Sequence, residues 1–158
     1  MTVDNPLATG AAPGKVILFG EHSVVYGRPA VAAALTHGLG AAAERSQQGP
    51  LLRIPRWGSH GLEVRPTSEE GADPVSRAFA AALLCVGCPV DEPVLVTVDG
   101  ALPLGVGLGS SAAFGVSLLR ALAAHHGSPL DQNELLSGAD AIEAIFHGQP
   151  SRSEEHTS

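Results

Sequence analysis

Short apolar runs alternate with glycine- and proline-containing segments over much of this chain. Valine, isoleucine and leucine dominate the runs, which is typical of buried or half-buried strands. The pattern predicts strands over residues 15–19, 51–54, 62–64 and 93–98. Residues 30–45 are alanine-rich, but Gly38 and Gly40 argue against one long helix, so we predict strand pairs there. We expect a frayed start over residues 1–12, a polar loop over 20–27 and a glycine-rich loop over 101–109.

Three longer segments have the apolar spacing or the end signals of helices. They are residues 73–86, 110–126 and 131–147. Asp73 is suited to cap the first segment and Pro74 to its first turn, while Asp131 and Glu134 have the spacing of a capping box. The segments are followed by Gly87, Gly127 and Gly148. Strands mixed with such helices predict an α+β or α/β domain.

Composition bounds the size and class of the protein. The chain has 158 residues, of which 44% are hydrophobic, close to the ~45–50% that is usual for globular proteins. This length is typical of one domain. The 19 glycines and 12 prolines have no collagen-like period and are expected to serve turns and close backbone passages.

Charge and special residues exclude several classes of function. A formal net charge of −7 disfavours nucleic acid and anionic membranes as partners. The sequence has no apolar run of about 18 residues that could span a membrane, and its start does not resemble a secretory signal. Cys85 and Cys88 form a lone C-x-x-C, which we interpret as structural. We expect a cytoplasmic protein that acts on a small molecule.

Lys15 is the only lysine among nine basic residues. The richness in alanine, glycine, proline and arginine suggests a GC-rich genome, in which lysine codons are scarce. A lysine that remains in such a chain is a candidate for a role that arginine does not fill, although a surface position is the simpler explanation until its neighbours are considered.

The glycine-rich segment at residues 102–113, LPLGVGLGSSAA, has the features of a phosphate cradle. Glycines at 105, 107 and 109 let the backbone approach a ligand closely. The helix that begins near Ser110 adds free N–H groups and the positive end of its dipole. The hydroxyls of Ser110 and Ser111 are available to cap the helix, to bind a phosphate oxygen or to bind Mg²⁺.

Two common phosphate-binding loops do not fit this segment. A P-loop requires G-x-x-x-x-G-K-[ST], and no lysine occurs here. A dinucleotide-binding fingerprint requires G-x-G-x-x-G, whereas this loop spaces its glycines as G-x-G-x-G. A dinucleotide-binding oxidoreductase is therefore disfavoured, and titration with ATP and NAD would separate the two classes.

Three segments resemble motifs of the GHMP kinases, a family of ATP-dependent small-molecule kinases. The glycine-rich segment is similar to the phosphate-binding motif P-x-x-G-L-G-S-S-A-A. Residues 12–27, APGKVILFGEHSVVYG, look like the first motif in its mevalonate-kinase form. Residues 143–151, EAIFHGQPS, resemble E-x-x-x-H-G-x-P-S-G-x-D. The three motifs occur in the family's order between residues 12 and 151, which makes the resemblance specific.

The resemblance implies a fold and a set of site residues. It implies a two-layer N-terminal domain with a ribosomal-protein-like α/β fold, which binds ATP and Mg²⁺ and phosphorylates mevalonate. Lys15 would be catalytic, Ser111 and Glu143 would bind Mg²⁺, and Glu21 and His22 would lie on the substrate side. His147 is interpreted as shaping the end of its helix. The ATP-binding residues would be Pro103, Gly105, Gly107, Leu108, Gly109, Ser110, Ser111, Ala112 and Ala113.

The chain departs from the family pattern at its C-terminal end. Arg152 stands where the motif has glycine, and Glu154 stands where it has the aspartate proposed as general base. Family members also carry a second, ferredoxin-like domain, which we expect to be missing here. The string RSEEHTS reads as the translation of a common sequencing adapter, so we assign residues 1–151 to the domain and 152–158 to a non-native or disordered tail.

These departures leave alternatives open. The chain as printed is expected to have little or no kinase activity, and a non-catalytic nucleotide-binding fragment is one alternative. Another kinase of the same family, such as a phosphomevalonate kinase, is a second. A homodimer is left open for a full-length protein.

Overall fold

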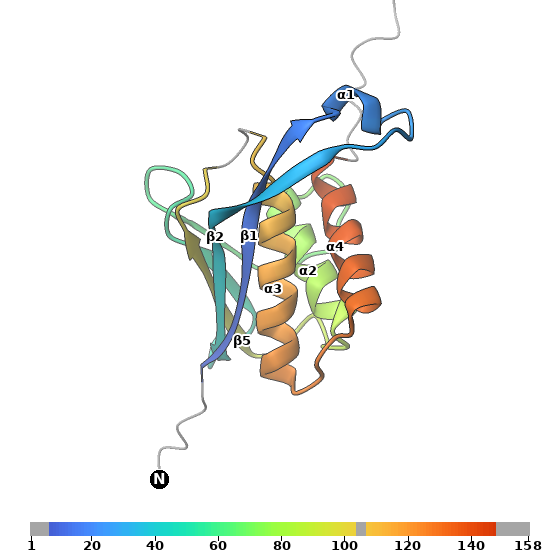
Figure 1. Ribbon diagram of the computed structural model, residues 1–158. Coiled ribbons are helices and arrows are strands. Elements are labelled where there is room, and N and C mark those ends of the chain that lie inside the picture. The colour runs from blue at the N-terminus through green and yellow to red at the C-terminus, as the bar shows by residue number, and fades with distance from the viewer. Residues whose placement is uncertain (1–6, 104–106, 148–158) are drawn as a thin grey trace, which may run out of the picture.

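Five strands form one sheet in the computed structural model, which describes residues 7–103 and 107–147 (Figure 1). The strands are β1 (Ala8–Phe19), β2 (Val31–Arg45), β3 (Leu51–Ile54), β4 (Leu62–Val64) and β5 (Val94–Gly100). Their order across the sheet is β1-β2-β5-β3-β4. Only β3 and β5 pair in parallel; the other neighbours are antiparallel.

Helices cover one face of this sheet, so the described chain has two layers (Figure 1). The covering helices are α2 (Pro74–Cys85), α3 (Ser110–His126) and α4 (Gln132–His147), and a short helix, α1 (Glu21–Val24), follows β1. The core lies between the layers and contains alternate residues of β5 together with Phe79 of α2 and Phe114 of α3, all fully buried. The prediction of a two-layer α+β domain is confirmed. No helix in the described part of the chain is long and apolar enough to cross a membrane.

The predicted helix ends are confirmed where the structure describes them. Asp73 caps α2, because its carboxylate accepts a hydrogen bond from the Ser76 N–H at 3.1 Å. Asp131 and Glu134 form the predicted capping box of α4: the Asp131 carboxylate accepts from the Glu134 N–H at 2.9 Å, and the Glu134 carboxylate accepts from the Asp131 N–H at 2.8 Å. Gly127 ends α3 with a φ of 73°. Gly148 lies outside the described residues.

Two predictions, the frayed start over residues 1–12 and the strand pairs over residues 30–45, were wrong for the part of each that the structure describes. The expected frayed start is part of β1 from Ala8 onward, and residues 31–45 form one long strand rather than strand pairs. The reason is close packing of small residues. A side chain at Gly10 would collide with the backbone of Ser117 in α3, and one at Gly38 would collide with the backbone of Ala12. Glycine at both places lets β1 lie directly against its neighbours.

The β1–β2 ribbon extends beyond the helical layer and carries α1 at its tip (Figure 1). The predicted polar loop at residues 20–27 therefore contains one short helix. Several large apolar side chains near this tip are exposed, and Phe19 and Tyr26 are 74% and 83% accessible. The tip thus has little packing of its own within the described chain.

Candidate functional site

The glycine-rich loop is attached to β1 through the lysine that the sequence singled out. The Lys15 N–H donates a hydrogen bond to the Leu108 carbonyl at 2.9 Å. The aliphatic part of the Lys15 side chain also packs on Gly109, where an added Cβ would lie 2.8 Å from the lysine Cγ. Gly109 has a φ of 69°, so both its backbone conformation and its neighbour favour glycine. Strand, loop and lysine are therefore held together.

The start of α3 has no side-chain cap. Its N-cap residue is Gly109, and among the described residues no side chain caps the first N–H groups. The capping alternative for the serine hydroxyls was therefore wrong. Ser110 is buried and Ser111 is half-buried. Uncapped N–H groups at a helix N-terminus, next to a glycine loop, favour an anionic group.

A cavity of about 490 Å³ lies where the loop, α3 and the end of α4 meet. Its wall contains predicted site residues from all three sequence motifs. The residues that line it are Lys15, Trp57, Gly107, Gly109, Ser110, Ser111, Ala112, Glu143, Phe146 and His147. Segments more than 120 residues apart in the chain thus contribute to one cavity.

Glu143 has an unusual environment within this cavity. Its Oε2 atom lies 3.2 Å from Nε2 of His147, one helical turn further along α4. Its Oε1 atom is buried and has no hydrogen-bond partner among the described residues. A buried carboxylate oxygen without a partner is costly, so it is a good candidate to receive a ligand.

The oxygen atoms at the cavity fit a magnesium ion that is bound together with phosphates. Mg²⁺ prefers hard oxygen ligands and is usually held by one or two protein groups plus phosphates and water. The hydroxyl of Ser111 and the unpartnered Oε1 of Glu143 are such groups. Among residues 7–103 and 107–147, no group of three or more histidine, cysteine or acidic side chains is arranged for a metal. A cation here would therefore need ligands from a bound phosphate chain.

Other predicted site residues lie outside this cavity. Ala113 is buried, and Leu108 contributes the carbonyl that accepts a hydrogen bond from the Lys15 N–H. Pro103 lines a neighbouring cavity. Glu21 and His22 are exposed on α1 and are absent from the lining of the glycine-loop cavity. Gly105 and Glu154 lie outside the described residues.

The sequence predicted no role at the cavity for three of the residues that line it. Trp57 and Phe146 were not considered, and His147 was assigned only to the helix end. The spacing of Glu143 and His147 by four residues was a signal that the two could pair. Trp57 gave no such signal, because its place at the cavity depends on how β3 and β5 pair.

The environment of the two cysteines favours the structural interpretation. Both thiols are free; Cys85 is exposed and Cys88 is buried. Burial raises the pKa of both thiols, and the charge of Glu92 raises the pKa of Cys88 further. A raised pKa lowers the fraction of reactive thiolate, which disfavours a catalytic or metal-binding role.

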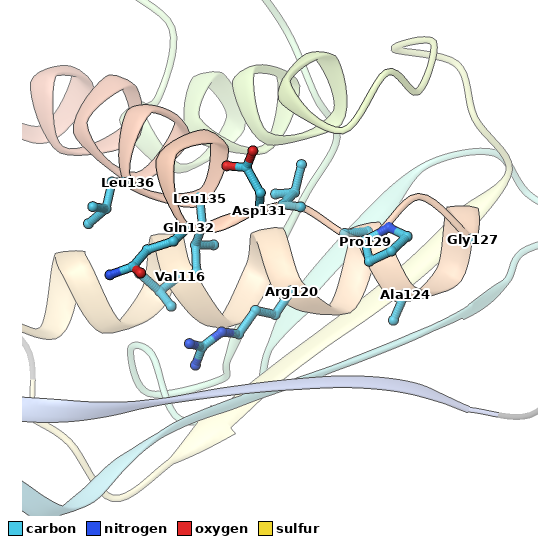
Figure 2. A pocket seen from close by; sticks show the side chains of 11 residues that line it. Val116, Arg120, Ala124, Gly127, Pro129, Asp131, Gln132, Leu135 and Leu136 are labelled. Atoms are coloured by element: carbon cyan, nitrogen blue, oxygen red, sulfur yellow. The ribbon is translucent and has the colours of Figure 1, made fainter.

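A larger cavity, of about 710 Å³, lies further along α3, where the chain turns into α4 (Figure 2). Val116, Leu135 and Leu136 are among the apolar residues that line it. Arg120 reaches from α3 toward β1, and its guanidinium donates a hydrogen bond to the Ala11 carbonyl. None of the residues predicted to act in the site lines this cavity, so its size alone does not make it the functional site.

The chain matches the profile of the GHMP kinases N terminal domain over residues 74–153. It is 35% identical to a mevalonate kinase from Aeropyrum pernix over 150 residues, which cover 91% of this chain and 45% of that protein. It is 34% identical to a mevalonate kinase from Methanothermobacter thermautotrophicus over 144 residues, with the same coverage. The chain spans about half the length of the curated relatives it matches.

Solved structures of kinases have the same fold. The mevalonate kinase of Methanococcus jannaschii superimposes with a TM-score of 0.73 at 21% identity, covering 96% of this chain and 50% of that one. The mevalonate kinase of a methicillin-resistant Staphylococcus aureus superimposes with a TM-score of 0.64 at 29% identity, covering 92% and 47%.

Proposed function

Because the chain belongs to the GHMP kinase family, we propose that it carries the nucleotide-binding part of a mevalonate kinase. The reaction transfers the terminal phosphoryl group of ATP to a hydroxyl of mevalonate, giving ADP and 5-phosphomevalonate. Residues 1–151 are assigned to the nucleotide-binding domain. We assign the reaction to the cytoplasm and to isoprenoid precursor synthesis.

One observation carries this proposal: residues of three separate motifs line one cavity. Lys15, Ser111 and Glu143 surround the space in front of the glycine loop. Phosphoryl transfer requires positioned phosphates, neutralised charge and a group that acts on the attacking hydroxyl. The Lys15 ammonium group, the uncapped N–H groups of α3 and the Glu143 carboxylate lie around one cavity. Together they can position the phosphates and neutralise their charge, and Lys15 can act on the attacking hydroxyl.

The nucleotide phosphates would lie on the loop and the start of α3. The backbone N–H groups near Gly109 and Ser110 would donate to phosphate oxygens, assisted by the helix dipole. Ser111 and Glu143 would hold Mg²⁺, which when bound neutralises charge on the phosphates. Lys15 belongs to none of the ion pairs among the described residues, so its ammonium group is available to stabilise charge on the reacting oxygen.

The acceptor would approach from the side of the ribbon tip. Glu21 and His22 lie on α1 near this tip, and His22 would donate a hydrogen bond to the mevalonate carboxylate. We assign no general base, because Glu143 is the only carboxylate among the described residues that line the cavity, and it is assigned to the cation. The position of the motif aspartate is taken by Glu154.

A transfer assay tests the proposal. Residues 1–151 would be fused to the part of the Methanothermobacter thermautotrophicus relative that lies beyond the matched region, and the fusion would be assayed with ATP, Mg²⁺ and either mevalonate or phosphomevalonate. Turnover of mevalonate supports the proposal. Turnover of phosphomevalonate alone would replace it with the other kinase of the pathway, and no MgATP binding at all would overturn the nucleotide site.

The 158-residue chain is the matched comparison in this assay. We expect it to bind MgATP and to show little turnover, because phosphoryl transfer requires a site closed to water and a misplacement of the reacting groups by about 1 Å already costs about 10²-fold in rate. Turnover by the chain within about tenfold of the fusion would contradict this expectation.

A further inference from the structure

His147 is the last residue of α4 and one of the residues that line the glycine-loop cavity. It lies one helical turn beyond Glu143. Side chains of a helix lean back toward its N-terminus, so the imidazole can reach the carboxylate. The distance from His147 Nε2 to Glu143 Oε2 is 3.2 Å, which suits a polar pair of nitrogen and oxygen. The imidazole therefore has a direct influence on how this carboxylate lies.

The two oxygens of the Glu143 carboxylate have different surroundings. Oε2 is paired with His147, whereas Oε1 is buried and has no partner among the described residues. The side chain of His147 is 69% exposed and that of Glu143 is 31% exposed, so the histidine lies on the solvent side of the pair. A carboxylate that is held through its outer oxygen keeps its inner oxygen available to a ligand.

A held carboxylate binds a cation better than a free one. A glutamate side chain has several rotamers and loses this freedom when it binds a metal. Carboxylates that bind metals are usually held by a further polar group, and loss of that group weakens metal binding about 10–100-fold. Lys15 lines the same cavity but belongs to none of the ion pairs among the described residues. His147 is thus the described side chain that meets this requirement for Glu143.

We propose that His147 is a positioning residue, which holds Oε2 of Glu143 so that Oε1 is presented to the cation that accompanies the nucleotide phosphates. This inference rests on the proposed function, since it requires Mg²⁺ and a phosphate chain in the cavity. The imidazole acts only through Glu143. It should therefore influence the part of the nucleotide affinity that depends on Mg²⁺ and leave the remaining part unchanged.

Binding of ATP with and without the cation tests this proposal. The 158-residue chain would be titrated calorimetrically with ATP in excess Mg²⁺ and with ATP in EDTA. His147→Leu removes the ring nitrogens, and we expect it to weaken binding about tenfold in Mg²⁺ but less than about twofold in EDTA. His147→Gln keeps an N–H donor on a side chain of similar reach, so its affinity in Mg²⁺ should stay within about threefold of the unsubstituted chain.

Two further variants separate positioning from a structural role at the helix end. His126→Leu is the matched control, because His126 is an exposed histidine in the last turn of α3 and lines neither the glycine-loop cavity nor the larger one. It should change neither titration. In a Glu143→Gln background, His147→Leu should have little further effect, since the carboxylate is already lost. An equal loss with and without Mg²⁺, or an undiminished loss in the Glu143→Gln background, would make His147 a helix-end residue only.

The same titrations separate this inference from the proposed function. If Mg²⁺ strengthens ATP binding equally in the unsubstituted chain and in the leucine variant, the positioning role is overturned and the nucleotide site stands. If the unsubstituted chain binds ATP in neither condition, the proposed function fails together with this inference. Urea unfolding checks that each variant is folded, and His147→Ala replaces the leucine variant if that variant unfolds.

Discussion

Two of the regions that carry family motifs, the glycine loop and the ribbon tip, are built differently. The glycine loop and the start of α3 are fixed by the Lys15–Leu108 hydrogen bond and by a fully buried helix face. The ribbon tip holds Glu21 and His22 on a helix of four residues, beside exposed apolar side chains such as Tyr26. The proposed phosphate site is therefore preorganised by the described chain, whereas the proposed acceptor side is not. Binding of nucleotide and binding of acceptor should be separable by mutation.

The largest expected difference between the regions is in stability. Phe114→Ala should lower the free energy of unfolding by about 3–5 kcal/mol, because it removes a fully buried ring from the core. Tyr26→Ser should change this free energy by no more than about 0.5 kcal/mol, because the side chain is 83% exposed. Urea unfolding of both variants measures the contrast. Similar losses would mean that the tip is packed against something and would contradict the comparison.

Lys15→Met should give the next largest effect, on the rate of transfer. In the fusion protein we expect kcat to fall about 10²-fold or more, since a charge that stabilises the transition state is lost. The Kd of ATP should stay within about threefold, because the loop still binds the phosphates. Lys15→Arg is the control that keeps the charge on a larger, planar group. A kcat close to that of the unsubstituted fusion would exclude Lys15 from the mechanism.

Ser111→Ala and Glu143→Gln should each weaken binding of MgATP about tenfold. Because both side chains are assigned to one ion, the double variant should lose less than the sum of the two single effects. Asp140→Asn removes an exposed carboxylate from the same helix and serves as the matched control. Calorimetric titration at several Mg²⁺ concentrations measures the coupling, and strict additivity would mean that the residues do not share a cation.

Substitutions at the tip should affect only the acceptor. His22→Asn should raise the KM for mevalonate in the fusion about tenfold, because a hydrogen bond to a carboxylate is weakened. Glu21→Gln tests the neighbouring position. The Kd of MgATP should change less than about twofold in either variant, since neither residue lines the glycine-loop cavity. A large change in nucleotide affinity would show that the two regions are not separable.

The smallest effect concerns the cysteines. Burial raises the pKa of Cys85 and of Cys88, so thiolate forms at higher pH in the folded chain than in the unfolded chain. Alkylation by iodoacetamide at pH 8 should therefore be slower by about a few fold when the chain is folded. The same shift makes the folded state slightly less stable as pH rises through the thiol pKa of the unfolded chain. Equal alkylation rates in buffer and in urea would contradict both expectations.

Local signals in the sequence predicted the helix caps, which depend only on residues that are close together in the chain. Asp73 and the Asp131–Glu134 pair are capping residues, and their hydrogen bonds reach only three residues along the chain. Glu143 was predicted as a site residue only through the resemblance to the GHMP kinases, because a single glutamate on a helix has no feature that marks it as a metal ligand. The unpartnered oxygen of that residue became visible only when the end of α4 was placed beside the start of α3.

Local sequence signals did not predict the contacts between segments that are far apart in the chain. Residues 8–12 lack the apolar run of a strand, yet they extend β1, because Gly10 permits close contact with α3. Trp57 reaches the glycine-loop cavity because β3 pairs in parallel with β5. Both arrangements depend on segments more than 35 residues away.

The sheet order β1-β2-β5-β3-β4 has a consequence for synthesis of the chain on the ribosome. The two hairpins, β1–β2 and β3–β4, are complete by Val64, but β5 joins them and is translated only at Val94–Gly100. At about 5–20 residues per second, the hairpins wait for seconds with unpaired edges on β2 and β3. In the nascent chain, the backbone amides of β2 and β3 should therefore become protected from hydrogen exchange together, in one late step, when residue 100 has left the exit tunnel.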